Sequence, residues 1–352
     1  MKAMIMAAGV GSRLMPLTAE VPKPMVPIVN KPVMEYCLEL LKSHKVTEII
    51  ANTHYKAEEI TGYFGDGKKL GINMQYSYEE QLLGTAGGVK NNRWFLDETF
   101  AIVSGDALTN INLTEMHKFH KEKGALATLA LTPVEDVSQY GVVVMDDNNK
   151  ITAFQEKPKK AEALSNMVNT GIYIFEPEIF EYIPEGVYDF GKELFPKLAR
   201  NKGEIYGFVT HDYWCDVGSL EVYKQANWDV LSGKFTMVGL ENNRIVNPVD
   251  MDTSAQVLGH SVIGCSCYIA NNAILKDTII WDNCLIKDKV VIDNAIIGSN
   301  CLIEENVQIA PDVVLGPGCV IGEGACIKAG VKLEAWSIIA PGMIVEENLA
   351  IG

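Results

Sequence analysis

The sequence predicts a mixed α/β domain followed by a β-helix, and two periodicities along the chain support this interpretation. From Met1 to about Gly233, apolar strands alternate with amphipathic helices, the pattern of a largely parallel sheet with helices on both faces. From about Val257 onward, an aliphatic residue returns every six positions instead. A chain of 352 residues is also long for a single compact domain. We therefore expect two structural parts with a short connection between them.

The α/β part contains runs that suit buried strands. Lys2–Ala7 and Phe100–Ser104 are almost continuously apolar, as central parallel strands are. Gly141–Met145 and Ile151–Gln155 flank a turn and predict an antiparallel pair. The other expected elements are helices Val33–Lys42, Lys56–Phe64 and Leu113–Lys123 and strands Glu48–Ala51, Ile72–Tyr78, Ala125–Leu131 and Gly171–Phe175. The pattern predicts one mixed sheet over residues 1–233.

The C-terminal part has a strict step of six residues. The positions are Ile297, Ile303, Ile309, Leu315, Ile321, Ile327, Leu333, Ile339, Val345 and Ile351, preceded by Ile263, Ile269 and Leu275 with small register slips between. A hexapeptide β-helix explains this step, because each six-residue side of a triangular coil directs one aliphatic residue inward. We therefore expect a β-helix over residues 257–352, with 234–256 as a linker or imperfect first coil.

Composition excludes several classes of partner. The formal net charge of −15 argues against nucleic acid or an anionic membrane surface as the main partner. No apolar stretch approaches the roughly 18 residues of a spanning helix, and the apolar start ends at Gly9, too early for a signal peptide. The eight cysteines form no CxxC pair and predict free thiols in a reducing compartment. We expect a cytoplasmic protein.

The first strand leads into a glycine-rich turn, Gly9–Leu14. A dinucleotide fingerprint needs a third glycine where Leu14 stands, and no GxxxxGK[ST] motif is present. In open α/β sheets, ligands bind at the carboxyl ends of strands, where backbone amides can approach phosphate oxygens. Arg13 adds a permanent charge, and Lys23 follows in a proline-rich stretch that restricts its backbone. Such a turn can bind phosphate, but taken alone a Gly-x-Gly-x-Arg segment is more often only a tight turn.

The whole segment Gly9–Pro32, GVGSRLMPLTAEVPKPMVPIVNKP, resembles the signature of nucleotide-sugar pyrophosphorylases, the sugar-1-phosphate nucleotidyltransferases. Motifs similar to those of the same family follow in order at Leu83–Gly88, Ser104–Asp106, Tyr140–Val143, Phe154–Pro158, Asn169–Tyr173 and Trp214–Gly218. The resemblance covers essentially the whole α/β part and is closest to mannose-1-phosphate guanylyltransferases. It implies a Rossmann-like sheet domain followed by a hexapeptide-repeat left-handed β-helix.

The resemblance also implies a reaction. A nucleoside triphosphate and a hexose 1-phosphate would give a nucleoside-diphosphate sugar and pyrophosphate, with Mg²⁺ held by Asp106 and Asp216. Such transfer requires neutralised phosphate charge and an aligned nucleophile, and Mg²⁺ prefers carboxylate and phosphate oxygens. By the same carry-over, Arg13 would hold the leaving pyrophosphate and Lys23 the α-phosphate region.

The remaining site residues are carried over from the matching motifs. The implied nucleotide-binding set is Ala8, Gly9, Gly11, Ser12, Arg13, Glu79, Glu80, Gly84 and Thr85. The implied sugar-phosphate set is Gly141, Glu156, Lys157, Asn169 and Thr170. On residue type alone, each of these acids and glycines would be an ordinary turn or strand-end residue.

The resemblance also implies that a side chain shortly before Gly84 contacts the nucleobase. Uracil and thymine present an N–H between two carbonyls, which suits an amide, whereas guanine presents two adjacent donors, which suit a carboxylate. Glu79 and Glu80 offer carboxylates, and Gln81 offers the amide. The sequence therefore favours GTP with mannose 1-phosphate, and UTP or dTTP with glucose 1-phosphate is the alternative.

Two other classes of function are weighed against this one. A hexapeptide acyltransferase usually needs a histidine in the repeat, and only His260 lies there. A silent regulatory subunit is disfavoured because the motif residues are retained. We expect the tail to form a homo-oligomer through outward residues such as Val262, Ile280 and Ile338, and helical histidines such as His120 to lie at the surface.

Overall fold

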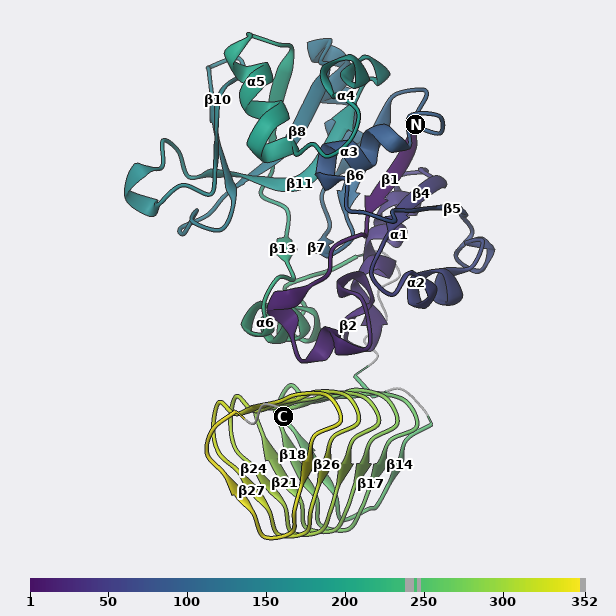
Figure 1. Cartoon of the computed structure of the whole chain (residues 1–352), viewed down its shortest axis with the longest axis vertical. Helices are drawn as coiled ribbons and strands as arrows, with labels where there is room; N and C mark the ends of the chain where they lie inside the picture. The colour runs from purple at the N-terminus through teal and green to yellow at the C-terminus, as the bar shows by residue number, and fades with distance from the viewer. Residues whose placement is uncertain (238–243, 246–247, 349–352) are drawn as a thin grey trace. The chain divides into compact units, whose positions relative to one another are not determined.

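The computed structural model describes residues 1–237, 244–245 and 248–348. Ile351 and part of the expected connection 234–256 lie outside the described residues. The chain folds into two compact units, the first made of Met1–Val10 and Val33–Asp216 and the second of Gly11–Pro32 and Val217–Gly352 (Figure 1). The glycine-rich turn is therefore divided between the units after Val10. Among the described residues, no helix is long and apolar enough to cross a membrane.

Parallel strands form one half of the sheet in the first unit. In the described chain the order is β6 (Phe100–Ser104), β1 (Lys2–Met6), β4 (Glu48–Thr53) and β5 (Asn73–Tyr78), each parallel to its neighbour. β1 and β6 are central and largely buried, which explains their continuous apolar runs. The carboxyl ends of the four strands lie at one edge of the sheet.

The other half of the sheet contains the antiparallel pairs. β11 (Met167–Phe175) pairs with β6 and carries β8 (Ala127–Pro133) and β9 (Gly141–Met145). β10 (Ile151–Glu156) pairs with β9 as expected, and β12 (Ile205–Val209) runs parallel to β8. The predicted mixed sheet is confirmed, with β11 beginning four residues earlier than the expected strand.

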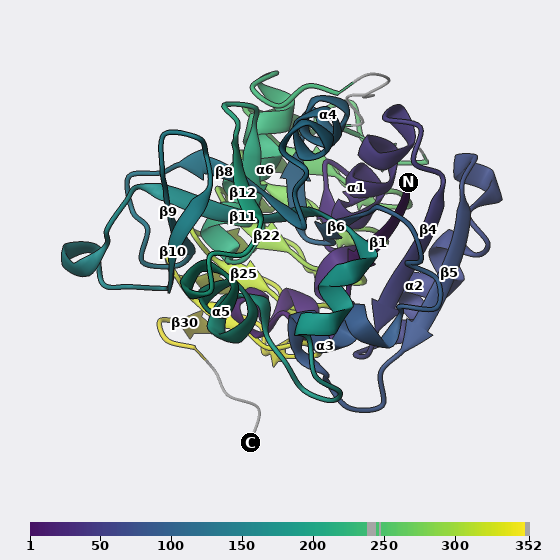
Figure 2. The same cartoon turned by 90° about the horizontal axis from the view of Figure 1, so that it is seen from above.

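Helices cover both faces of this sheet. They are α1 (Val33–Ser43), α2 (Ala57–Phe64), α3 (Gly84–Asn91), α4 (Leu113–Lys123) and α5 (Phe195–Arg200), and Figure 2 shows α1 and α4 on one side of the strands and α3 and α5 on the other. α4 has its predicted bounds because Asn112 caps its first turn and Gly124 ends it in a left-handed conformation. α3 was not among the helices expected from the sequence. It is helical because the amides of Ala86 and Gly87 bond to the carbonyl of Tyr188.

His120 does not lie at the surface as expected, because it is completely buried. Its helical spacing from Leu113 and Met116 places it on the face of α4 that packs on the sheet. One ring nitrogen contacts the Thr128 hydroxyl at 2.8 Å and the other lies 3.2 Å from a Glu176 carboxylate oxygen. Burial lowers the pKa of His120 to about 4, although Glu176 opposes this shift.

The second unit contains the signature segment and one long helix. The segment has three short 3-10 turns, Ser12–Leu14, Leu17–Ala19 and Lys23–Met25. It ends in a hairpin of β2 (Pro27–Ile28) and β3 (Lys31–Pro32). The helix is α6, Leu220–Leu231, which begins after the capping side chain of Ser219.

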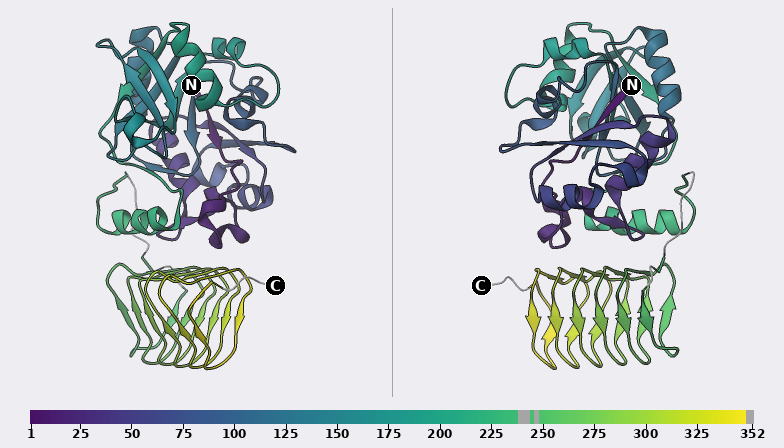
Figure 3. Two further views of the ribbon diagram at one scale, coloured as in Figure 1. Left: turned by 60° about the vertical axis from the view of Figure 1, so that its left-hand side comes forward. Right: turned by 90° about the vertical axis from the view of Figure 1, so that its right-hand side faces the viewer.

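The rest of the second unit is the expected left-handed β-helix, whose stacked coils are seen edge-on in Figure 3. The β14 sheet contains β14 (Asp250–Met251), β17 (Tyr268–Ile269), β20 (Leu285–Ile286), β23 (Leu302–Ile303), β26 (Val320–Ile321) and β29 (Ile338–Ile339). The β15 sheet contains β15 (Gln256–Leu258), β18 (Ile274–Lys276), β21 (Val291–Asp293), β24 (Gln308–Ile309), β27 (Cys326–Ile327) and β30 (Ile344–Val345). The β16 sheet contains β16 (Val262–Ile263), β19 (Ile279–Ile280), β22 (Ile296–Ile297), β25 (Val314–Leu315) and β28 (Lys332–Leu333).

Strand pairing explains the register slips in the repeat. Ile280 pairs with Ile263 and with Ile297, two steps of 17 residues, whereas Ile297 pairs with Leu315, a step of 18. Each of the two early coils is therefore one residue short. The inward aliphatic residues are almost completely buried and form one continuous core.

The outward residues of the β-helix differ between its sheets. Val262 is buried, and so are Ile296 and Val314 below it in the β16 sheet. Ile280 faces the core, because the slip before it shifts its register. The expectation that Val262 and Ile280 offer contact surface was therefore wrong, whereas Ile338 in the β14 sheet is 77% exposed.

Four cysteines form a column inside the β-helix. Each thiol donates to a carbonyl of the following coil at 3.1–3.3 Å, and the four are Cys267, Cys284, Cys301 and Cys319. All eight cysteines of the chain are free thiols, as the sequence predicts.

Candidate active site

The site residues expected from the signature segment fall on both sides of the division between the units. Ala8 and Gly9 follow β1 in the first unit, while Gly11, Ser12, Arg13 and Lys23 belong to the second. Within the second unit, Gly11 has a left-handed backbone (φ 72°), and a Cβ there would lie 2.8 Å from the Cβ of Lys23. Glycine at this position thus lets the turn approach Lys23 closely.

Asp106 and Asp216 are brought together by a short strand pair. β7 (Ala107–Thr109) pairs antiparallel with β13 (Trp214–Asp216), and Asp216 stands opposite Ala107. Asp106 immediately precedes Ala107, so the two carboxylates lie at the same end of this pair. The Ser104 hydroxyl donates to Asp106. The structure therefore places two half-buried carboxylates beside the carboxyl end of β6.

Trp214 links this strand pair to the residues expected at the sugar phosphate. Its indole N–H donates to the carbonyl of Thr170 at 2.9 Å. Its ring also contacts Tyr140, with ring centres 5.2 Å apart, and the Tyr140 carbonyl accepts from the amide of Lys157 at 3.1 Å. Asp216, Thr170 and Lys157 are thus connected through Trp214 and Tyr140, two aromatic residues that lie in the matching motifs but were not among the expected site residues.

Glu156 and Gly141 are partners in the β9–β10 ladder. A Cβ at Gly141 would collide with the Phe154 ring and would lie 3.3 Å from a Glu156 carboxylate oxygen, so glycine leaves room for this carboxylate. Burial raises the pKa of Glu156, although the neighbouring Lys157 opposes the shift. Lys157 itself is exposed and has a left-handed backbone.

Asn169 and Thr170 bond to the protein scaffold. The Asn169 amide donates to the Tyr173 hydroxyl at 2.8 Å, and its oxygen accepts from the amide of Gly171 at 3.1 Å. The Thr170 hydroxyl donates to the carbonyl of Ala130 at 2.9 Å. These bonds fix the side chains of Asn169 and Thr170 against neighbouring groups of β11 and β8.

Glu79 is buried and bonded through both carboxylate oxygens. One accepts from the Asn52 amide at 2.7 Å and the other from the amide of Leu83 at 3.0 Å. Asn52 in turn accepts from the amide of Ala7, directly after β1, at 2.9 Å. Glu79 therefore joins the ends of β1 and β4 to the start of α3, while Glu80 is exposed.

Thr85 and Gly84 pack on a π-helical segment, Phe190–Leu194. The Thr85 hydroxyl donates to Asp189 at 3.1 Å and accepts from the amide of Phe190 at 2.8 Å. A Cβ at Gly84 would lie 2.6 Å from the Tyr188 carbonyl oxygen. Asp189 was missed from the sequence, although an aspartate that precedes a helix is a usual capping signal.

The donor set of the strand pair suits a divalent cation. In the described part of the chain, no group of three or more His, Cys, Asp and Glu residues is arranged to hold a metal. Two carboxylates at one strand end are nevertheless the protein share of a site that phosphate oxygens and water complete.

Comparison with known proteins gives the family. Residues 2–233 match the nucleotidyl transferase family model, and residues 236–327 match that of the EIF2B subunit epsilon left-handed β-helix domain. This chain belongs to the sugar-1-phosphate nucleotidyltransferases. The resemblance noted in the sequence and the expected order of folds are thereby confirmed. Enzymes of this family generally use a divalent metal.

The relatives of this nucleotidyltransferase differ in base and sugar. UTP–glucose-1-phosphate uridylyltransferase of Synechocystis is 42% identical over 322 residues, which cover 80% of this chain and 83% of the relative. Mannose-1-phosphate guanylyltransferase of Mycobacterium tuberculosis is 31% identical over 287 residues, covering 80% and 79%. HddC from Yersinia pseudotuberculosis, solved also in complex with GMP-PN, is 27% identical with a TM-score of 0.57 and covers 65% of this chain and 99% of its own.

Proposed function

We propose that this enzyme transfers the uridylyl group of UTP to glucose 1-phosphate. A phosphate oxygen of the sugar phosphate forms a bond to the α-phosphorus, and the bond from that phosphorus to the β-phosphate oxygen breaks, releasing pyrophosphate. The observation that carries the choice of base is the buried Glu79, whose two oxygens already accept from Asn52 and Leu83. The exposed amide of Gln81 remains for a uracil edge. The Synechocystis relative supports the same choice.

GTP with mannose 1-phosphate, which the sequence favours, is the second candidate. Glu80 is exposed and could accept from the two adjacent donors of guanine. The Mycobacterium relative carries that specificity in its name.

We assign the metal, Mg²⁺, to Asp106 and Asp216. These two carboxylates would hold the cation, which would supply neutralisation of the phosphate charge. The Ser104 hydroxyl donates to Asp106 and keeps this carboxylate in position after the end of β6.

The phosphates and the sugar are assigned to separate residue sets. The nucleotide is assigned to the backbone of Ala8, Gly9, Gly11 and Ser12, together with Gly84 and Thr85. Its phosphates are assigned to Arg13 and Lys23, which would neutralise their charge. Gly141, Glu156, Lys157, Asn169 and Thr170 hold the sugar phosphate. In this set the Lys157 ammonium binds phosphate, and the Glu156 carboxylate accepts from sugar hydroxyls.

A substrate panel tests the choice of base. Pyrophosphate release is measured for UTP, dTTP and GTP against glucose and mannose 1-phosphates with Mg²⁺. We expect UTP with glucose 1-phosphate to react fastest. Faster turnover of GTP with mannose 1-phosphate would reverse the assignment. In that case the variant Glu80→Gln should lower kcat/KM for GTP by the equivalent of about 1–3 kcal/mol and leave kcat/KM for UTP unchanged.

We also propose a cytoplasmic homo-oligomer formed through the β-helix. The eight free thiols support a reducing compartment. The β14 sheet presents an outward row that includes Tyr268, Leu285 and Ile338, of which Ile338 is the most exposed. Ile338→Glu should move the protein to a smaller species in size-exclusion chromatography, whereas Lys328→Glu on the neighbouring coil should not. A monomeric wild-type protein would contradict this proposal.

A further inference from the structure

The hairpin that closes the signature segment has a strained turn. β2 and β3 are joined by Val29 and Asn30, which both have a left-handed backbone, with φ of 44° and 64°. Two-residue hairpins favour such turns, but normally with Asn and Gly at these positions. Val29 is β-branched and buried, so its conformation is costly in isolation. The surrounding structure must therefore hold this turn in place.

Hydrogen bonds to two other parts of the second unit hold the turn. Asn227 of α6 is completely buried; its side-chain oxygen accepts from the amide of Val29 at 2.7 Å, and its nitrogen donates to the Tyr223 carbonyl at 2.9 Å. The Asn30 side chain donates to the carbonyl of Ile263, in a β-helix coil, at 2.9 Å. The turn is thus bound both to α6 and to the β-helix.

A second contact between the β-helix and the segment involves Trp336. Most coil corners with a left-handed backbone carry Asn, Asp or Gly, whereas Trp336 has φ 65° and is 59% exposed. Its ring lies so close to Gly318 that any Cβ there would collide with it. The indole N–H donates to the Glu20 carboxylate at 3.4 Å. Trp336 thus gives the β-helix a second contact with the segment, at a corner where small or polar residues are usual.

We propose that α6 and the β-helix hold the phosphate-binding segment Gly11–Pro32 in its working geometry, with Asn227 as the main positioning residue. This inference rests on the proposed roles of Arg13 and Lys23. Lys23 lies between two prolines shortly before β2. The prolines stiffen this part of the chain, so a displacement of the Val29–Asn30 turn would also shift the backbone of Lys23. Gly11 packs against Lys23, which extends the same displacement to the turn that carries Arg13.

The variant Asn227→Ala tests the inference. It removes the acceptor of the Val29 amide, and we expect kcat/KM for the nucleoside triphosphate to fall about 10- to 100-fold, the range that a misplacement of about 1 Å costs. KM for the sugar 1-phosphate should stay unchanged, because that substrate is assigned to residues of the first unit. Adding Val29→Gly relieves the left-handed strain and should restore part of the lost kcat/KM.

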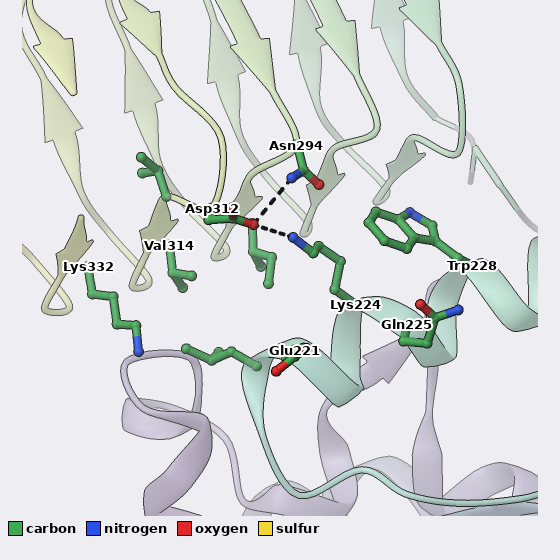
Figure 4. A pocket seen from close by; sticks show the side chains of 11 residues that line it. Glu221, Lys224, Gln225, Trp228, Asn294, Asp312, Val314 and Lys332 are labelled. Atoms are coloured by element: carbon green, nitrogen blue, oxygen red, sulfur yellow. Dashed lines mark hydrogen bonds and ion pairs between the residues drawn. The ribbon is translucent and has the colours of Figure 1, made fainter. Parts of the chain in front are cut away.

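Lys224→Met is the matched control on the same helix. Lys224 forms an ion pair with Asp312 of the β-helix at 2.5 Å and lines a cavity of about 570 Å³ between α6 and the coils (Figure 4). Its replacement removes one ion pair with the β-helix but no bond to the turn, so the kinetic constants should not change. Trp336→Ala, at an exposed site, should lower kcat/KM for the triphosphate less than Asn227→Ala and provides a variant that folds in any case.

Four outcomes decide the matter. Equal losses in Lys224→Met and Asn227→Ala, or equal effects on both substrates, would overturn the positioning role. Normal kinetics in both Asn227→Ala and Trp336→Ala, with Lys23→Ala inactive, would overturn this inference alone. An active Lys23→Ala would instead refute the phosphate-binding role in the proposed function.

Discussion

The two cores of this protein are built on different principles. In the first unit, aromatic rings stack on one another. The ring centres of Phe190 and Phe195 are 5.3 Å apart, and those of Tyr173 and Phe175 are 5.4 Å apart. In the β-helix, Ile, Leu, Val and Cys repeat at equivalent positions of successive coils. In the first core no position is equivalent to another, because a strand, a helix and a π-helical segment meet there.

This difference separates two kinds of stability. Each coil contacts only its neighbours, so the β-helix behaves approximately as a sum of similar units. The first unit joins strands that are distant in sequence, and its packing is expected to be lost cooperatively. The proposed catalytic carboxylates and sugar-phosphate residues lie in the cooperative unit.

The largest effect is expected where this unit carries chemistry. Asp106→Ala or Asp216→Ala should remove several kcal/mol of transition-state stabilisation, and with it nearly all turnover. The melting transitions should shift little, because both carboxylates are only half-buried and the lost Ser104 bond to Asp106 is worth about 1 kcal/mol. Pyrophosphate release over a series of Mg²⁺ concentrations checks this, with the exposed Asp147→Ala as the control. Near-normal turnover in either site variant would refute the metal assignment.

A core truncation in each unit sharpens the comparison. Phe175→Ala should cost about 3–5 kcal/mol and unfold the first unit as a whole. Ile303→Ala should cost about 2–4 kcal/mol and loosen the coils next to it. Amide hydrogen exchange distinguishes the two, because protection would be lost throughout the sheet in one variant and around β23 in the other. Uniform loss over all coils in Ile303→Ala would contradict the additive description.

Acid should weaken the first unit before the β-helix. The folded pKa of His120 is lowered to about 4 by burial, below the unfolded value of about 6.5. The contribution of neutral His120 to the free energy of unfolding is therefore fully present above pH 6.5. It is lost as the pH falls towards 4, and the loss is at most about 3 kcal/mol. Glu176, whose pKa is also lowered in the folded state, adds a loss in the same direction. Thermal unfolding at pH 7 and pH 5 measures this effect, and His120→Asn should reduce it whereas the exposed His211→Asn should not.

The smallest effect concerns the cysteine column. Cys301→Ala removes one buried thiol and its bond to the Gly316 carbonyl, which should cost about 1 kcal/mol. Cys267 and Cys319 lie several coils apart, so the losses in the free energy of unfolding caused by Cys267→Ala and Cys319→Ala should add when the two are combined. Chemical denaturation of the single and double variants checks this. A marked departure from additivity would show that the coils do not act as independent neighbours.

Much of the fold is local information. The bounds of β6, β9 and α4 agree with the sequence pattern, because period and capping residues lie within a few positions of each other. The six-residue step identified the inward side chains from Ile297 to Val345, since these coils repeat the same local geometry, but it missed Ile280, where the coils are one residue short. The motif residues Asp106, Asp216, Glu156 and Lys157 were named through the resemblance to the family, and their roles stay predictions.

Long-range contacts decided the rest. Only tertiary structure shows that Gly84–Asn91 is a helix, because its first turn bonds to Tyr188, about a hundred residues away. The same applies to Glu79, whose burial depends on Asn52, and to the Gly11–Pro32 segment, which groups with α6 and the coils. The division at residues 233 and 256 stays a prediction that limited proteolysis can test. Periodicity records which side of an element is apolar, but a single polar side chain finds its partner only when distant segments meet, and no local pattern encodes that meeting.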